Sequence, residues 1–228
     1  MKRIYVDEVG CSSIAGPVLC CAVAIEPEHE PVDGVQDSKK LTRKKREMLF
    51  DELSKFPHTY GSASPRKIEK LNIFYAKFEA MRIAIERLLK QTDADKVIVD
   101  GNFTIPNLNF PQECIIKADD KIWQVGVASI LAKVKRDRVM EELSKIEKYS
   151  YYGLETNAGY YTPAHRLGIV LNGGTTLHRT NFKYYQYCLA KREEYLKNGN
   201  MEIKKGDFTN WRDSQKDLFK IITYKETL

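Results

Sequence analysis

Two adjacent acids inside a strand-like run constrain the fold of this chain more than any other feature. Asp7 and Glu8 interrupt an apolar run over residues 4–9. A buried carboxylate without a partner costs several kcal/mol, so such a pair needs a compensating cation. A glycine-containing turn and a second apolar run follow directly. We therefore expect two antiparallel strands, at 2–9 and 17–26, with a metal ion offsetting the two charges.

The rest of the chain alternates between strand-like and helix-like segments. Thr42 is a plausible N-cap for a helix over 43–55. Residues 72–90 carry apolar side chains at steps of four and three, which predicts a helix with one buried face formed by Phe74, Phe78, Met81, Ile85 and Leu88. Further strands are expected at 58–63, 96–101 and 112–119, and further helices at 125–146, 163–172 and 183–197. This order predicts an α/β fold with a mixed central sheet flanked by helices.

The length of 228 residues fits one sizeable domain with an appendage. We expect the domain to cover 1–197. Residues 198–228 begin with Asn-Gly-Asn and carry many charges, so we expect a helical C-terminal appendage with a short helix near 213–221. The sequence leaves its role open.

Charge and cysteine content narrow the class of protein. The formal net charge of +6 favours a polyanionic partner such as nucleic acid, although a solvated basic surface is about equally common. Five cysteines without Cys-x-x-Cys spacing suggest neither a disulfide framework nor a zinc site. The chain shows no leader pattern and no apolar run near the ~18 residues that a membrane span needs. We expect a cytoplasmic, monomeric protein with no membrane partner.

More acids stand where strands are expected to end. Asp100 precedes Gly101, and Asp119 ends the strand expected at 112–119, with Asp120 as its rival. An acid before a glycine more often simply begins a turn, but this explanation is weaker for the pair inside the first strand. Oxygen-rich clusters suit Mg²⁺ or Mn²⁺, and two such ions can drive phosphodiester hydrolysis.

Several short motifs occur together in a fixed order over about residues 3–185. They are Asp7-Glu-Val-Gly10, Ala15-Gly-Pro17, Asp37-Ser-Lys-Lys-Leu41, Val99-Asp-Gly101, Lys117-Ala-Asp119, Ala128-Ser-Ile-Leu-Ala-Lys-Val-Lys-Arg-Asp137, Gly159-Tyr-Tyr-Thr162 with His165, and His178-Arg179 with Phe182. In this set the chain resembles the type 2 ribonucleases H, the ribonuclease HII family. The ordered set is far more specific than any single motif.

The resemblance implies a ribonuclease H-like fold and a divalent-metal-dependent endoribonuclease. The enzyme would cut the RNA strand of RNA–DNA hybrids, or DNA at embedded ribonucleotides, leaving 5′-phosphate and 3′-hydroxyl ends. Its catalytic and metal-binding residues would be Asp7, Glu8, Asp100 and Asp119. Its substrate-binding residues would be Gly10, Cys11, Ser12, Lys39, Lys40, Lys133, Arg136, Tyr160 and His165. Ser129 is expected to pack rather than to contact substrate, and His178 and Arg179 to be structural or to bind the backbone.

The first turn departs from the family pattern. The family has Gly-Arg-Gly there, or Gly-Thr-Gly in the ribonuclease HIII branch, and its backbone contacts the ribose 2′-hydroxyl together with a tyrosine, here Tyr160. This chain has Gly10, Cys11 and Ser12. A side chain at the third position would be costly if that residue needed a positive φ. We therefore expect incision at a single ribonucleotide to be weaker than cleavage of longer hybrids.

Three other activities stay open at this point. The motif Asp-Glu-Val-Gly, which the ribonuclease HIII branch shares, allows a ribonuclease HIII-like specificity for longer hybrids. The altered turn allows a hybrid-binding protein with little turnover, although a binder has no need for four acids. A nuclease of the same fold that acts on DNA is the third alternative.

Overall fold

A computed structural model describes residues 1–198. Within this part of the chain, one sheet contains β1 (Arg3–Val9), β2 (Val18–Ile25), β3 (His58–Ala63), β4 (Val97–Asp100) and β5 (Gln112–Ile115), in the order β3-β2-β1-β4-β5. β2 is antiparallel to β1 and β3, whereas β4 is parallel to β1 and β5. The predicted mixed sheet is confirmed.

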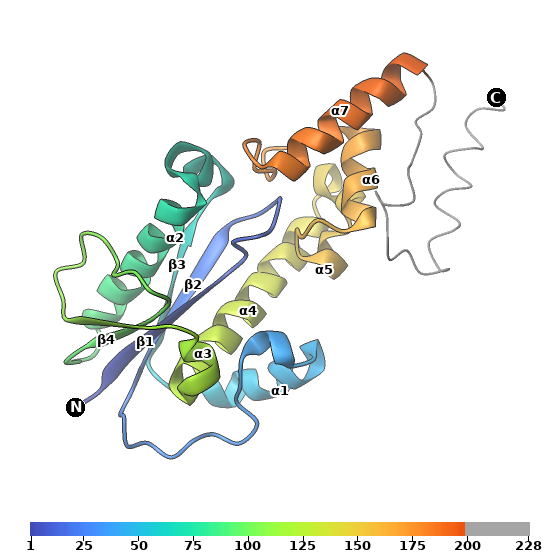
Figure 1. Ribbon diagram of the computed structural model, residues 1–228. Coiled ribbons are helices and arrows are strands. Elements are labelled where there is room, and N and C mark those ends of the chain that lie inside the picture. The colour runs from blue at the N-terminus through green and yellow to red at the C-terminus, as the bar shows by residue number, and fades with distance from the viewer. Residues whose placement is uncertain (199–228) are drawn as a thin grey trace.

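Helices surround the sheet and extend past one end of it (Figure 1). They are η1 (Ser38–Lys40), α1 (Arg43–Leu53), α2 (Pro65–Leu89), α3 (Ala118–Lys121), α4 (Trp123–Ser144), η2 (Glu147–Tyr152), α5 (Leu154–Asn157), α6 (Pro163–Asn172) and α7 (Lys183–Asn198). Thr42 caps α1 as expected, because its side chain accepts a hydrogen bond from the Lys45 backbone N–H. Among the described residues, no helix has the length and apolar character that a membrane span requires.

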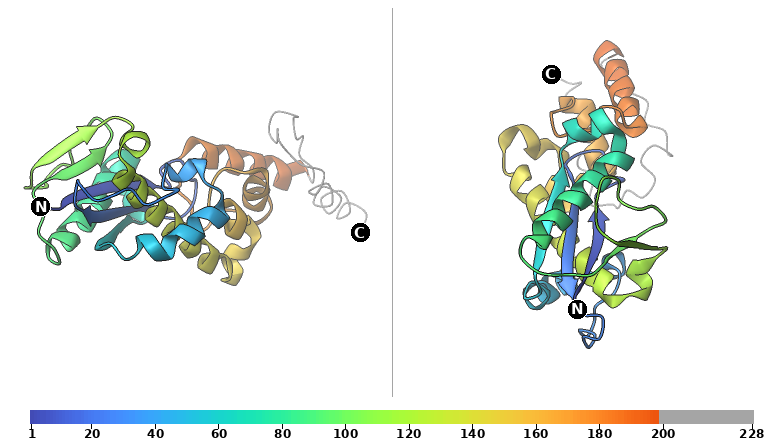
Figure 2. Two further views of the ribbon diagram at one scale, coloured as in Figure 1. Left: turned by 90° about the horizontal axis from the view of Figure 1, so that it is seen from below. Right: turned by 90° about the vertical axis from the view of Figure 1, so that its left-hand side faces the viewer.

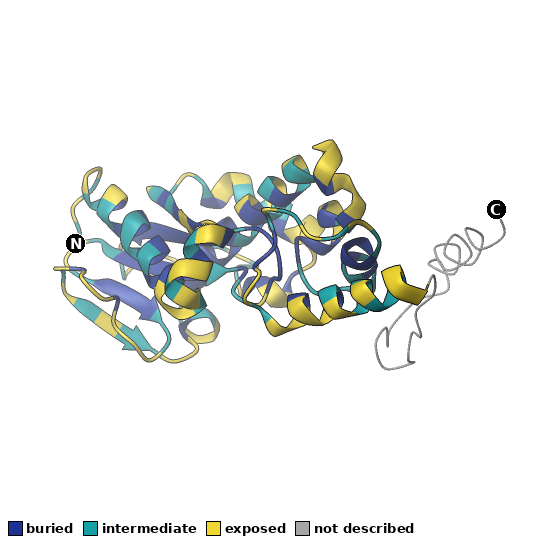
Figure 3. Cartoon of the chain, turned by 90° about the horizontal axis from the view of Figure 1, so that it is seen from above, coloured by how far each residue is buried: buried dark blue, intermediate teal, exposed yellow. Residues whose placement is uncertain are grey.

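The two faces of the sheet bury different side chains. Ile4, Val6 and Cys20 pack in a cluster with α2, whereas Tyr5 and Cys21 pack on the opposite face in a cluster with α1 and α4. This alternation is the period of two of a β-strand. Figure 3 shows the result, with buried strands between helices whose outer faces are exposed. The sheet is therefore sandwiched between α2 and the pair α1 and α4.

Helix α2 differs from the helix predicted over 72–90. It begins earlier, at Pro65, because Ser64 provides an N-cap and proline suits the first turn. It also breaks at Asn72, which has φ 63° and accepts the Phe74 backbone N–H as a second cap. The predicted burial of Phe74 is wrong: this ring is 39% exposed, since it lies just after the break.

The C-terminal helices form a smaller unit beyond the sheet. Figure 2 shows α6 and α7 extending away from the strands. A third hydrophobic cluster joins Ile14 of the first turn to Met140 of α4 and to Ile169, Tyr185 and Cys188 of α6 and α7. The first turn is thus fixed to the C-terminal helices. The appendage expected at 198–228 lies outside the described residues from position 199 onward.

Candidate active site

The adjacent acids of β1 leave opposite faces of the sheet. Asp7 shares the face of Tyr5 and is hydrogen-bonded by the Ser129 side chain from α4. Glu8 shares the face of α2, where its Oε1 lies 3.8 Å from Lys77 Nζ. The side chains of successive strand residues point to opposite faces, so the two carboxylates lie on opposite sides of the end of β1.

The parallel neighbour of β1, strand β4, and the start of α3 bring the other two acids to the same edge of the sheet. Val6 is paired with Val99, so the next residue, Asp100, ends β4 beside Asp7. The Ala118 backbone N–H donates to Asp100 Oδ1 at 2.7 Å, which ties the start of α3 to β4. Asp119 follows at once. The carboxyl ends of parallel strands therefore collect the predicted carboxylates, as expected for an α/β sheet.

The structure separates Asp119 from its rival Asp120. Asp119 is half-buried and acts electrostatically on Asp100. Asp120 is exposed, and its Oδ1 accepts a hydrogen bond from Lys40 Nζ at 2.6 Å. This ion pair holds the pKa of the Asp120 carboxyl below its usual value. Asp119 is the better fourth member of the cluster.

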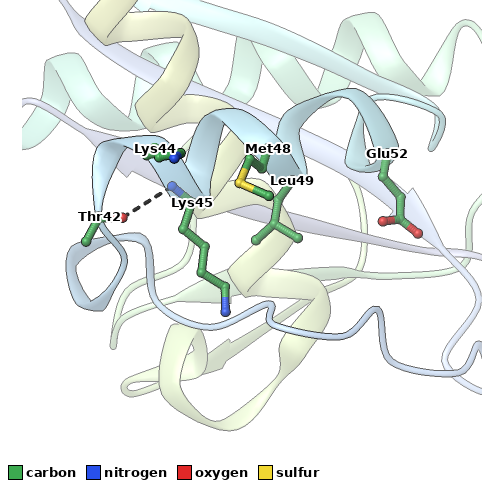
Figure 4. A pocket seen from close by; sticks show the side chains of 6 residues that line it. All are labelled: Thr42, Lys44, Lys45, Met48, Leu49 and Glu52. Atoms are coloured by element: carbon green, nitrogen blue, oxygen red, sulfur yellow. Dashed lines mark hydrogen bonds between the residues drawn. The ribbon is translucent and has the colours of Figure 1, made fainter.

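A cavity of about 260 Å³ opens beside these acids. It is lined by Asp7, Glu8, Val9, Gly10, Cys11, Ser12, Ser38, Lys39, Asp100, Ser129, Lys133 and Tyr160. A larger hollow of about 480 Å³ lies along α1, and Figure 4 shows its lining side chains. That hollow is formed by Thr42 and the following helix alone and contains one acid, Glu52, so it has no set of groups for catalysis.

Burial and, second to it, the crowding of like charges raise the pKa values of Asp7 and Asp100 at the sheet edge. The pKa of Asp7 lies well above its ordinary value because the carboxyl is buried and because Glu8 and Asp100 are close. The pKa of Asp100 is also raised, by burial and by Asp119, although the Ala118 N–H opposes the shift. A cation bound here would relieve both the desolvation and the repulsion.

The donor set fits a hard divalent ion. Mg²⁺ prefers oxygen ligands and usually binds through one or two carboxylates, waters and substrate phosphates. Within residues 1–198, no three acidic, histidine or cysteine side chains are close enough to form a complete cage by themselves. Ligands from water and from a phosphate would therefore complete the coordination of ions held by these carboxylates.

Basic and aromatic residues surround the cavity from two helices. Asp37 caps η1 through the Lys39 backbone N–H, and Lys39 Nζ reaches within 3.5 Å of Asp119 Oδ2 while staying 78% exposed. From α4, Lys133 Nζ lies 5.4 Å from the centroid of the Tyr160 ring and pairs with Asp137. Lys39, Lys133 and Tyr160 all line the cavity. Lys40 does not line the cavity, because it pairs with Asp120 outside it.

The expectation that Arg136 contacts the substrate is wrong. Lys133 and Arg136 are both expected to bind substrate, but Arg136 is fully buried. Its three guanidinium nitrogens donate to the carbonyls of Pro17, Ala158 and Ala15, at 2.9, 2.7 and 3.2 Å. The side chain is occupied in holding the first turn, so its place in the fold is structural.

The first turn is tightly built around two buried arginines. Gly10 has φ +91°, and a Cβ at this position would overlap Arg136 Nε. Arg179, also fully buried, donates to the carbonyls of Cys11 and Gly16, which agrees with the structural role expected for it. Cys11 and Ser12 both have ordinary negative φ values, so Ser12 does not carry the expected strain. Gly10, Cys11 and Ser12 all line the cavity.

His165 also corrects an expectation, because it is fully buried away from the cavity. Its Nε2 lies 3.1 Å from His178 Nε2, and its Nδ1 lies 3.0 Å from the Tyr160 carbonyl oxygen. Burial among aromatic rings places the imidazole behind Tyr160. His165 supports the residue that lines the cavity and does not reach it.

Two residues at the site were missed or given another role. Ser129, expected only to pack, lines the cavity and hydrogen-bonds both Asp7 and Ser38. Lys77 reaches Glu8 from α2. Lys77 could not be singled out from the sequence, because nothing in the apolar period of α2 distinguishes it from the other lysines of that helix.

Comparisons with known proteins agree with this geometry. The sequence model of the family Ribonuclease HII matches residues 4–185. The chain is 44% identical over 179 residues to a ribonuclease HII of Caldicellulosiruptor saccharolyticus, covering 78% of this chain and 84% of that protein. It is 38% identical over 191 residues to a ribonuclease HII of Francisella philomiragia, covering 83% of this chain and 100% of that protein.

Solved structures show the same fold. The ribonuclease H2 of Pyrococcus horikoshii OT3 superposes with a TM-score of 0.69 at 25% identity, covering 87% of this chain and all of that one. Bst-RNase HIII in complex with Mn²⁺ superposes with a TM-score of 0.66 at 18% identity, covering 85% of this chain and 71% of that one, which is a likeness of fold alone. With its family match, its relatives and its sheet-edge carboxylates, this chain belongs to the ribonuclease HII family of ribonuclease H enzymes.

Proposed function

We propose that this protein is an endoribonuclease that hydrolyses the RNA strand of RNA–DNA hybrids at the carboxylate edge of the sheet, with Mg²⁺ or Mn²⁺ as its cofactor. The observation that carries the proposal is the convergence of Asp7, Glu8, Asp100 and Asp119 at the ends of β1 and β4 and the start of α3. Family membership supports the same activity.

Each side chain has a task that follows from its position. Asp7, Glu8, Asp100 and Asp119 would hold the divalent ions, which supply an activated water and stabilise the leaving oxygen. The exposed ammonium of Lys39 and the cavity-lining Lys133 would bind phosphates on either side of the cut and fix the register of the duplex. Ser129 keeps Asp7 in place through its hydrogen bond.

The first turn and Tyr160 would contact the ribose. Both line the cavity, and Arg136 and Arg179 hold the turn through hydrogen bonds to its backbone carbonyls. Ser12 offers an exposed hydroxyl as a hydrogen-bond partner for a 2′-hydroxyl. We propose that longer hybrids are cut faster than a single embedded ribonucleotide, because Cys11 replaces the family arginine.

Cleavage of three labelled duplexes tests the function: an RNA–DNA hybrid, DNA with one ribonucleotide, and DNA alone. The wild-type protein should cut the hybrid with either ion, whereas Asp7→Asn should lose at least about 10³-fold in rate, as expected for a ligand of a catalytic metal. Asp120→Asn is the matched control, because Asp120 lies on the same edge but outside the cavity.

The three duplexes also separate the competing activities. Hybrid binding without cleavage by the wild-type protein would refute the nuclease and leave a binding protein. Cleavage of the all-DNA duplex would indicate a DNA nuclease. Equal rates on the hybrid and on the single ribonucleotide would remove the proposed effect of Cys11.

We further propose that the protein acts as a monomer in the cytoplasm. Its five cysteines are free thiols, as is common in reducing compartments. Sedimentation equilibrium would test the monomer, and a mass of twice 26.3 kDa would contradict it.

A further inference from the structure

A lysine from α2 approaches the active site from behind the cavity. Lys77 Nζ lies 3.8 Å from Glu8 Oε1, and the two side chains are only 22% and 20% exposed. Cys11 Sγ lies 3.6 Å from the same carboxylate oxygen. Glu8 therefore has two partners supplied by the protein before any ion arrives.

The surroundings of Lys77 hold it in this position. Its backbone carbonyl accepts a contact from Cys20 Sγ of β2 at 3.6 Å, and its ammonium lies 5.1 Å from the centroid of the Phe78 ring. Glu8 faces α2 because of strand alternation, so the contact follows from the packing of α2 on the sheet. Because the pair is partly buried, water and salt weaken its attraction less than they weaken that of an ion pair on the surface.

We propose that Lys77 is a positioning residue that acts as a resident cation at Glu8 and sets the affinity of the nearby divalent-ion position. This inference rests on the proposed function, because it requires the carboxylates to bind metal. A divalent ion that binds Glu8 must displace the ammonium or bind beside it, and either event costs Coulomb energy. The ammonium thereby weakens the ion position on the α2 side of the sheet.

The effect is confined to one side of the cluster. Asp7 faces α4, and Asp119 lies at α3 next to Lys39. Lys77 is an ion-pair partner of Glu8 and not a liner of the cavity. An ion bound on the Asp7 and Asp119 side should therefore keep its affinity when Lys77 is replaced. The two ion positions would then differ in affinity because of a residue outside the carboxylate set.

Direct Mn²⁺ binding to the full chain tests the proposal without any assay of cleavage. Isothermal titration calorimetry at fixed pH and ionic strength should show Mn²⁺ binding on the order of tenfold more tightly to Lys77→Met than to wild type, given a lost repulsion between a single and a double charge. Lys77→Arg should restore the wild-type affinity. Lys67→Met is the matched control, because Lys67 pairs with Glu79 on the same helix.

Thermal unfolding supplies a second readout. Metal-free Lys77→Met should melt below the wild-type protein, because Glu8 loses its partner, and saturating Mn²⁺ should raise its melting temperature by more than it raises that of wild type. Lys77→Gln serves the same comparison if the methionine variant does not fold. This variant keeps a polar side chain but removes the charge.

Three outcomes would overturn the proposal, and they are distinguishable. Equal Mn²⁺ affinities for wild type, Lys77→Met and Lys77→Gln would refute the role of Lys77 and leave the metal site standing. An absence of Mn²⁺ binding to all of them would refute the metal site and this inference together. A tenfold gain in Lys67→Met as well would show a general charge effect and would equally refute a specific role of Lys77.

Discussion

Acidification should destabilise this protein through the buried pair His165 and His178. All four ring nitrogens have partners only when both rings are neutral. His165 Nδ1–H donates to the Tyr160 carbonyl, His178 Nε2–H donates to His165 Nε2, and His178 Nδ1 accepts the Thr175 backbone N–H at 2.9 Å. A further proton on either ring would set two donors against each other.

The size of the effect follows from the two pKa values. Burial, together with His178, lowers the pKa of His165 from 6.5 to about 3, and burial lowers that of His178 to about 4. The folded values lie below the unfolded value, so the unfolded chain binds more protons and stability is lost as the pH falls below about 6.5. Between pH 7.5 and 5 each histidine should remove roughly 2 kcal/mol from the free energy of unfolding.

Urea unfolding at pH 7.5 and 5.0, followed by circular dichroism, measures this loss. His178→Gln keeps an amide donor toward His165 but cannot titrate, so its stability should fall by about 2 kcal/mol less than that of wild type over this range. Asp7, with its raised pKa, acts in the opposite sense but is common to both proteins and cancels in the difference. His29→Gln, at an exposed loop position, is the control.

The same loss of stability in wild type and His178→Gln would refute the reasoning. An imidazole signal of either buried histidine that titrates near pH 6.5 by nuclear magnetic resonance would refute it as well. Such a signal would show that the ring accepts a proton in the folded protein without the cost expected from its partners.

Two further predictions concern the support of the active site. Arg136→Met should lower the free energy of unfolding, measured with urea, by about 3–5 kcal/mol, because buried carbonyls lose a charged donor. Arg138→Met, at an exposed position, should cost under ~1 kcal/mol. Equal losses in the two variants would contradict a structural role specific to Arg136. Gly10→Ala should lower the melting temperature, because Gly10 has a φ of +91° and an added Cβ would overlap the Arg136 side chain. Ser12→Ala, at a residue with an ordinary φ, should leave the melting temperature nearly unchanged. An unchanged melting temperature for both variants would refute the steric explanation.

The order and type of the main elements could be predicted because their patterns are local. The alternation around Asp7 and Glu8 and the apolar run of β2 indicated two central strands, and Thr42 marked the start of α1. The break at Asn72 could not be predicted from hydrophobic period, because it depends on a side-chain cap that competes with the helix.

The candidate site was less predictable, since contacts across the fold decide which polar groups reach it. Lys133 and Arg136 are one turn apart in α4, but the first turn packs over Arg136 and leaves Lys133 at the cavity. His165 follows a motif near Tyr160 in sequence, yet its ring turns into the C-terminal cluster. The spacing of residues predicts which of them share a helix face, but it does not predict which loop covers part of that face.

The opposite directions of Asp7 and Glu8 have a consequence for how the family can diversify. A substitution at Lys77 of α2 acts on Glu8, and one at Ser129 of α4 acts on Asp7, because the two helices pack on opposite faces of the sheet. Substitutions can therefore change the surroundings of one acid without changing those of the other, or the motif that carries both.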